Sequence, residues 1–386
     1  MKRGRDPQEA HRVSTPLELL FDLSFVVAIA LASAQLHHGE AEHHWTVIPQ
    51  YLAAFFGIWW AWMNYTWYAS AYDNDDLLFR LLTMAQMFGV LVFAVGIPGF
   101  FSGDLLAATI GYALMRLALV AQWLLAARDD PPHRRTCLHY AIGIAVVQVL
   151  WIARLALPPV WFWPGFVLLC VLELLVPVWA ERAGATPWHA HHIAERYALM
   201  VIICLGECVL GAANAVSNVW RAGAGGWSLD LGIVGLASML LVLVMWWLYS
   251  LLPSGQALHH HRERAFAWGY GHYLLFAAVA AMGSGLEVVA DTLKPAEAGA
   301  AAAHALSPLL AISAVAVPQA ILVAAIGLLF GHALHMGATG SRGWWAGLAA
   351  IAAVPLAVAA GLPLPWALLA LSIGPTLLII WLTPRP

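Results

Sequence analysis

Long apolar runs recur along almost the whole chain, from Leu17 to Leu382. A run of about 20 apolar residues is long enough to cross the hydrocarbon core of a bilayer as a helix. In lipid, only helices or closed barrels satisfy every backbone hydrogen bond. The runs are continuous and do not alternate with period two, which favours helices over barrel strands. The sequence therefore predicts an all-α integral membrane protein.

Composition and charge agree with this prediction. Of 386 residues, 62% are hydrophobic and only 10% are charged, whereas a soluble domain carries about 25% charged residues. The net charge of −3 and the lack of a basic tract give no indication of nucleic-acid binding. The cysteines lie within or beside apolar runs, which predicts small buried hydrophobes and no disulfide framework. They are Cys137, Cys170, Cys204 and Cys208.

The apolar runs divide into about twelve candidate spans, separated by turn and charge signals such as Asp73 to Asp76 and Lys294-Pro295. We divide the chain into a cytoplasmic segment 1–16, a six-helix half 17–180, a cytoplasmic linker 181–194 and a second six-helix half 195–386. Both halves start on the same side, so a repeat between them would be parallel. The spans are approximately 17–36, 46–67, 77–101, 105–126, 136–156, 160–180, 195–216, 228–252, 266–290, 305–331, 343–361 and 364–382.

The distribution of positive charge predicts the orientation. With the N-terminus inside, nearly all Lys and Arg outside the spans fall on the inner side, and only Arg221 and Lys294 fall outside. The positive-inside rule therefore predicts that both termini are cytoplasmic. The basic N-terminus before Ala32-Ser33-Ala34 resembles a signal peptide, but Glu18 and Asp22 interrupt the apolar run, so we expect a retained first span. We interpret tryptophans near the span ends, Trp59, Trp60 and Trp62 among them, as headgroup anchors.

Acids inside the spans are the strongest indication of function. An intramembrane carboxylate costs about 2.5–3.5 kcal/mol on insertion scales, so it normally faces the bundle interior or a water-filled cavity. Glu18 and Asp22 are four residues apart and share one face of the first helix. Two carboxylates so close should repel each other, which suits the handling of protons or cations. The alternative is that they are hydrated at headgroup level or paired with Arg12.

Three further candidates lie on the seventh span. Glu195 and Arg196 open it at the inner edge, and Glu207 lies about 18 Å further along at 1.5 Å per residue. Glu207 should therefore be deep in the hydrocarbon core, and it is the residue on which we expect function to depend most. Gly206 beside it would allow a neighbouring helix to approach closely. The alternative is a protonated Glu207 that serves packing alone.

Arg116 and Glu173 lie in the middle of the fourth and sixth spans. An unpaired buried charge is expensive, so Arg116 should meet an acid or a ring of carbonyls, although the sequence does not say which acid. Such a pair could conduct ions or simply hold helices together. Arg154, Glu287 and Asp291 are further intramembrane or near-membrane charges.

Histidines offer candidate metal ligands without a specific spacing. His191 and His192 precede the seventh span on the inside, and a tract from His37 to His44 falls in the predicted first outside loop. Neither follows a pattern such as H-E-x-x-H, so a pH-responsive or positioning role stays open. No nucleotide-binding loop, nucleophile elbow or CxxC pair is present, so enzyme chemistry has little support, and we predict no cofactor.

Two segments resemble a known family. Thr15 to Ala30 resembles the E-L-x-F-D-L-x-F-V-x-A-I opening of the bacterial low temperature requirement protein A family. His191 to Leu199 with Leu205-Gly206-Glu207 resembles that family's H-x-x-E-R-x-x-L segment followed by L-G-E, although Cys208 stands where the family has Ser. The resemblance implies a multi-pass protein of the bacterial plasma membrane and no particular activity. The opening is also similar, over a shorter stretch, to the F-S-D-G-x-F-A-I-A motif of a family of potassium and proton channels.

Three functions fit these features. The first is a transporter or channel for protons, cations or a small solute, for which the candidate residues are Glu18, Asp22, Glu195, Arg196, Glu207, Arg116 and Glu173. The second is a non-catalytic membrane sensor or scaffold, favoured if each acid is fixed to an arginine in a dry core. The third is a membrane-embedded lipid-modifying enzyme that uses His191, His192 and Glu195. The expected partner in every case is the lipid bilayer, and the sequence does not define an oligomeric state.

Overall fold

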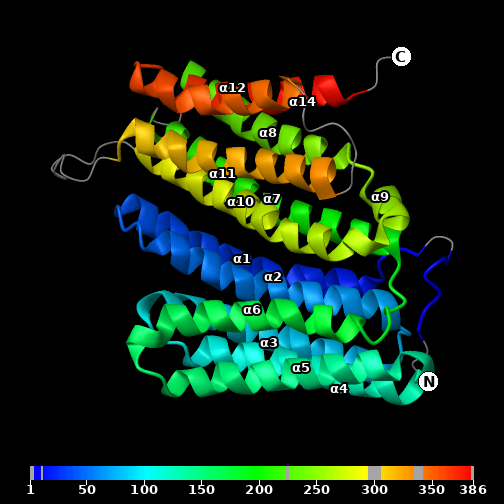
Figure 1. The fold of residues 1–386 in the computed structure, drawn as a ribbon. Coiled ribbons are helices and arrows are strands. Elements are labelled where there is room, and N and C mark those ends of the chain that lie inside the picture. Colours follow the sequence, from blue (N-terminus) through cyan, green and yellow to red (C-terminus); the bar gives the residue numbers. More distant parts are fainter. Residues whose placement is uncertain (1–3, 10–11, 223–225, 294–305, 334–341, 384–386) are drawn as a thin grey trace. The chain divides into compact units, whose positions relative to one another are not determined.

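The computed structural model describes residues 4–9, 12–222, 226–293, 306–333 and 342–383 (Figure 1). The predicted break at Lys294-Pro295 lies outside these residues, as do the charges Lys2, Arg3 and Arg385. Within the described part the chain forms helices and contains no β-strand.

Every predicted span corresponds to helix. The first half contains α1 (Pro16–Ala41), α2 (Val47–Tyr72), α3 (Leu77–Ser102), α4 (Leu106–Asp129), α5 (Arg134–Ala153) and α6 (Phe162–Glu181). The second contains α7 (Ala190–Ala222), α8 (Leu229–Ser250), α10 (Ala265–Thr292), α11 (Pro308–Leu328), α12 (Arg342–Ala359), α13 (Leu364–Leu371) and α14 (Ile373–Leu382). Short helical turns join them: η1 (Pro131–His133), η2 (Arg154–Ala156), η3 (Pro159–Trp161), α9 (Ser254–His260), η4 (Arg262–Arg264) and a π turn, η6 (Leu329–Ala333).

Eleven helical segments of the described chain are long and apolar enough to cross a membrane. Helix α2 is not among them, although it has 26 residues and matches a predicted span. Its sequence is rich in Trp and Tyr, which hydropathy scales rate as less apolar than aliphatic residues. The fold is therefore that of an all-α multi-pass membrane protein.

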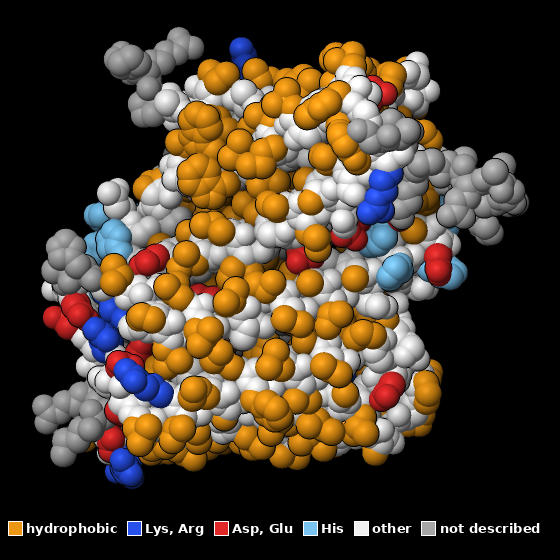
Figure 2. All heavy atoms as spheres, turned by 180° about the vertical axis from the view of Figure 1, so that it is seen from behind, with side chains coloured by type: hydrophobic (Ala, Val, Ile, Leu, Met, Phe, Trp, Pro, Cys, Tyr) orange, Lys and Arg blue, Asp and Glu red, His pale blue; other side chains and the backbone are white. Residues whose placement is uncertain are grey.

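The outer surface is suited to lipid. Large aliphatic side chains point outward along the helices, and Val95 and Leu356 are exposed over more than 70% of their surface. Figure 2 shows hydrophobic side chains dominating the face that it draws. Monomeric soluble proteins rarely expose large contiguous apolar surfaces.

Local signals begin and end the helices. Asp76 accepts a hydrogen bond from Phe79 N and caps α3, and Ser228 does the same for Leu231 N at the start of α8. Gly103 ends α3 with φ 93°, a conformation that favours glycine. Helices α3 and α4 touch at Gly89 and Gly111, where a Cβ would collide with the backbone of the other helix.

The chain forms two compact units that do not follow chain order. The first unit comprises residues 1–31 and 56–196, and the second comprises 32–55 and 197–386. The division falls inside α1, α2 and α7, so each of these helices contributes residues to both units. Each unit buries its own set of charged side chains. The division into halves at 181–194 stays a prediction.

Candidate functional site

The first unit buries a charged cluster formed by the beginnings of α1 and α7. The Arg196 guanidinium donates from Nε to Asp22 Oδ2 at 2.8 Å and from Nη2 to Asp22 Oδ1 at 2.5 Å. Its Nη1 lies 3.2 Å from Glu18 Oε1. All three side chains are at most 2% exposed. One guanidinium on α7 thus neutralises charge on two carboxylates of α1.

Both carboxylates have further partners besides Arg196. Trp62 Nε1 donates to Asp22 Oδ1 at 2.7 Å, and the Thr15 backbone N–H donates to Glu18 Oε2 at 2.7 Å. Arg12 Nη2 lies 3.4 Å from Glu18 Oε1, and His192 Nε2 lies 3.2 Å from the same oxygen. The expected repulsion between Glu18 and Asp22 is therefore offset by two arginines.

A second buried ion pair joins α4 to α6 in the same unit. Arg116 Nη2 donates to Glu173 Oε2, and both side chains are 1% exposed. Trp60 Nε1 donates to Glu173 Oε2 at 2.9 Å, and Tyr112 donates its hydroxyl hydrogen to Oε1 at 3.0 Å. The prediction that Arg116 pairs with an acid is confirmed, and the acid is Glu173.

The interpretation of Trp60 and Trp62 as headgroup anchors is wrong. Both are fully buried, and each donates an indole N–H to a core carboxylate. A buried indole needs an acceptor, so tryptophans inside an acid-bearing bundle were a signal of carboxylate partners. Exposed tryptophans such as Trp161 and Trp246 remain compatible with anchoring.

The second unit contains Glu207, the acid on which we expect function to depend most. Glu207 on α7 is 9% exposed and forms no hydrogen bond or ion pair with any described residue. Glu287 on α10 lies within electrostatic range of it. Within the described part of the chain, Glu207 thus lacks a guanidinium partner such as Asp22 and Glu173 have.

The close helix approach expected at Gly206 occurs at a different glycine. A Cβ on Gly206 would meet nothing within 4 Å, so that prediction is wrong. A Cβ on Gly283 of α10 would lie 2.6 Å from Glu207 Cβ, and one on Gly211 would lie 2.7 Å from Gly283 O. Gly283 and Gly211 therefore let α7 and α10 touch where Glu207 lies.

Other polar groups of the second unit connect α1 and α7 to α10. His37 Nε2 lies 2.7 Å from Asp291 Oδ2, and its Nδ1 lies 3.4 Å from Glu287 Oε2. Asn214 Nδ2 donates to Glu287 Oε1 at 3.0 Å, and Ser284 Oγ donates to Glu40 Oε2 at 3.2 Å. His37 and Glu40 were expected in a loop, but α1 continues to Ala41 and includes both.

The remaining candidates do not converge on one site. Glu195 is half-buried, and its Oε1 lies 3.5 Å from the Ser14 backbone nitrogen. His191 is exposed, whereas His192 is buried against Glu18. Among the described residues, no group of three or more His, Cys, Asp or Glu could hold a metal ion. The enzyme alternative stays a prediction.

The cysteines behave as the sequence predicted. All four are free, three are buried and Cys170 is half-buried. Cys208 Sγ donates to Val279 O at 3.3 Å on α10, so the cysteine at this position has a packing partner.

The helices, the lipid-compatible surface and the buried ion pairs define a multi-pass α-helical membrane protein with ionisable groups inside its bundle. A family model described as bacterial low temperature requirement A protein (LtrA) matches residues 13–381. The chain belongs to this family, as the two sequence motifs indicated.

Comparison with curated proteins adds a relative but no activity. The chain is 29% identical over 242 residues to an uncharacterized protein of Rhizobium meliloti (strain 1021). The match covers 60% of this chain and 57% of that protein, so it spans little more than half of the relative's length. No solved structure matches.

Proposed function

We propose that the protein moves protons or small cations across the membrane and that Glu207 is the group that carries them. The observation behind this proposal is that Glu207 is buried in the bundle with neither an arginine partner nor a hydrogen bond among the described residues. A charged carboxylate in such surroundings is unstable unless it binds a proton or a cation. Glu287 nearby increases that tendency, because it adds a second negative charge.

The acids of the first unit have another role in this proposal. Asp22 and Glu173 each meet a fully buried arginine, and a carboxylate neutralised in this way has little tendency to exchange ions. Glu18, Asp22, Arg196, Arg116 and Glu173 would therefore fix helix positions while the second unit carries the ion.

The setting of the proposed activity is the bacterial plasma membrane with both termini in the cytoplasm. The support is the distribution of Lys and Arg along the chain, since these residues stay on the cytoplasmic side of short loops.

The test is ion flux into liposomes that contain the purified protein, followed with proton- and potassium-sensitive dyes across a pH gradient. Wild type should conduct, Glu207→Gln should reduce the flux to that of empty liposomes, and Glu42→Gln should leave it unchanged. Glu42 is a suitable control because its side chain is 67% exposed. Flux that survives Glu207→Gln in a folded protein would exclude Glu207 as the carrying group.

A non-catalytic sensor or scaffold is the second candidate. The observation that favours it is that the core acids of the first unit are fixed to arginines and fully buried. If folded wild type passes neither protons nor potassium, the scaffold becomes the better proposal.

A further inference from the structure

The second unit contains an apolar pocket of about 580 Å³ between the 32–55 segment and helices α10 and α11. A volume of this size is typical of small-molecule sites. Its walls are almost entirely apolar, with Leu52, Leu274 and Ile321 among the lining residues. The pocket is partly open to its surroundings, so a ligand can enter it without a helix having to unfold.

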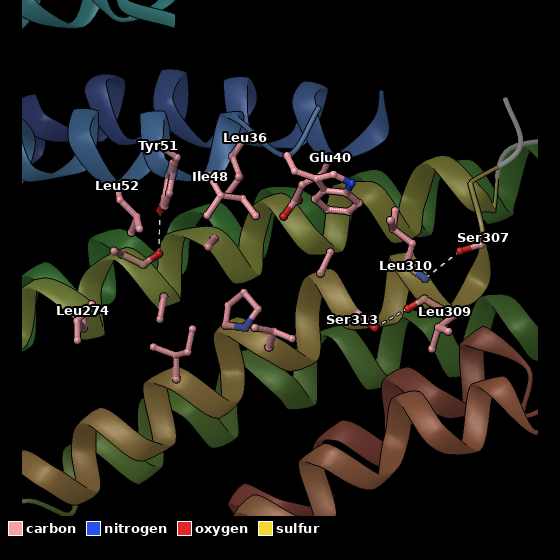
Figure 3. Close-up of a pocket in the computed structure, with 18 residues that line it drawn as sticks. Leu36, Glu40, Ile48, Tyr51, Leu52, Leu274, Ser307, Leu309, Leu310 and Ser313 are labelled. Atoms are coloured by element: carbon pink, nitrogen blue, oxygen red, sulfur yellow. Dashed lines mark hydrogen bonds between the residues drawn. The ribbon is translucent and has the colours of Figure 1, made fainter. Parts of the chain in front are cut away.

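The pocket changes in polarity along its length (Figure 3). Glu40 and Ser307 lie toward one end, where α1 ends and α11 begins, and Leu52 and Leu274 lie toward the other. From Leu309 to Ile321 the lining follows α11 for about 18 Å at 1.5 Å per residue. A polar end and a long apolar wall match a molecule with one aliphatic chain and one polar head.

The hydroxyl groups that line the pocket each take part in one hydrogen bond with the backbone. Tyr51 donates to Ala277 O at 2.8 Å, and Ser313 Oγ donates to Leu309 O at 2.6 Å. Ser307 Oγ accepts from Leu310 N at 3.1 Å as the cap of α11. These three bonds are the dashed lines of Figure 3. These hydroxyls and the Trp45 indole N–H are uncharged groups, and Glu40 supplies the one carboxyl among the described lining residues.

Glu40 is 8% exposed and accepts one hydrogen bond, from Ser284 Oγ at 3.2 Å. A carboxylate has room for about four such bonds. His37, a basic side chain within electrostatic range of Glu40, already contacts Asp291 and Glu287. The charge that complements this end of the pocket is therefore positive.

We propose that this pocket binds an amphipathic cation, an aliphatic chain that bears one ammonium group, with the ammonium against Glu40 and the chain along the apolar wall. The inference does not rest on transport by Glu207, because Glu40 and the pocket walls are separate from that residue. A neutral amphiphile could form a hydrogen bond at the polar end but would lack the charge attraction to Glu40, and an anionic one would be repelled by the Glu40 carboxylate.

The test is equilibrium binding of radiolabelled dodecylammonium to the full chain in phosphatidylcholine nanodiscs, with binding to empty nanodiscs subtracted. Dodecanol and dodecanoate have the same chain and serve as the neutral and anionic probes. Wild type should bind the ammonium about tenfold more tightly than the alcohol, which corresponds to one charge-assisted contact. Dodecanoate should bind weakest.

Three variants locate the site. Glu40→Gln should lower ammonium binding to the level of the alcohol and leave alcohol binding unchanged. Val317→Trp should weaken both, because Val317 lines the pocket and is 55% exposed, so a larger side chain there fills the opening without entering the core. Glu42→Gln is the control, because Glu42 is two residues from Glu40 and its side chain is exposed. This variant should bind dodecylammonium as tightly as wild type does.

Equal affinity of wild type for the ammonium and the alcohol would overturn the proposal and identify the occupant as an uncharged acyl chain of the bilayer. The wild-type comparison of the three head groups decides this point without any substitution. Unchanged ammonium binding by Glu40→Gln, or by Val317→Trp, would place the cation elsewhere and overturn the proposal as well.

Discussion

The acids of the two compact units differ in what faces them. In the first unit, Asp22 and Glu173 are each bound by a guanidinium and by aromatic N–H or O–H donors. In the second, Glu207 has no such partner among the described residues, and Glu40 has a single serine. Helix α1 carries both the arginine-paired Asp22 and Glu40, whose partner is a serine. Helix α7 carries both Arg196, which pairs with Asp22, and Glu207.

This difference indicates that buried carboxylates have two different roles inside the bundle. A carboxylate that is matched by an arginine and by further donors fixes the rotation of its helices, since removing either partner leaves a bare charge. A carboxylate without a partner contributes little to holding the bundle and is free to bind a proton, a cation or a ligand. Substitutions in the two units should therefore change different properties.

The largest effect is expected for Arg196→Gln, which leaves both Glu18 and Asp22 without their shared guanidinium. Breaking a buried pair by removing one partner costs about 3–5 kcal/mol of unfolding free energy. Reversible unfolding in detergent should show this loss. Adding Asp22→Asn to Arg196→Gln should recover part of it, and an unchanged stability of the single variant would refute the structural role of this cluster.

The second largest effect is expected for Glu173→Gln, which should lower the free energy of unfolding by about 3 kcal/mol. Trp60 and Tyr112 donate to different oxygens of Glu173, so the amide keeps an acceptor for one of them, and it leaves Arg116 buried without a counter-charge. The same unfolding measurement applies. The double variant Arg116→Met with Glu173→Gln should be more stable than Glu173→Gln alone, and a double variant that is less stable would show that Arg116 has another partner.

Glu207→Gln should change the free energy of unfolding by less than about 1 kcal/mol, because Glu207 has no ion pair or hydrogen bond with a described residue to lose. Its thermal midpoint in the same detergent should match that of wild type. A loss as large as that of Glu173→Gln would remove the distinction between the two units.

A pH dependence of stability is expected from Asp73, which lies after the end of α2. Burial, together with the nearby charge of Glu18, raises the pKa of Asp73 to about 6. The folded protein then binds a proton more readily than the unfolded chain, whose Asp pKa is about 3.9. This contribution to stability is therefore present below about pH 4 and is lost as the pH rises through about 6.

Asp73→Asn provides the control for this titration. The variant should lack the decline between about pH 4 and pH 6 and should keep its stability at higher pH. Unfolding measured across this range checks the prediction, and an Asp73→Asn curve parallel to that of wild type would assign the titration to another group.

The sequence by itself determined the membrane class, the helices and most of the charged candidates. Apolar run length and intramembrane charge are local properties, so Glu18, Asp22, Arg196, Arg116 and Glu173 could be selected without any structure. The family followed from two motifs that surround these acids, and the match over residues 13–381 agrees with them.

Only the tertiary structure decided which groups meet. Arg116 pairs with Glu173, and Trp60 and Trp62 are buried where their indole N–H groups donate to core carboxylates. Gly283, and not Gly206, makes the close helix contact at Glu207. These outcomes depend on how each helix is rotated about its axis. In a chain whose lipid-facing and buried surfaces are both apolar, hydrophobic periodicity does not mark the inward face, so helix rotation is set by side-chain packing and charge pairing across the bundle.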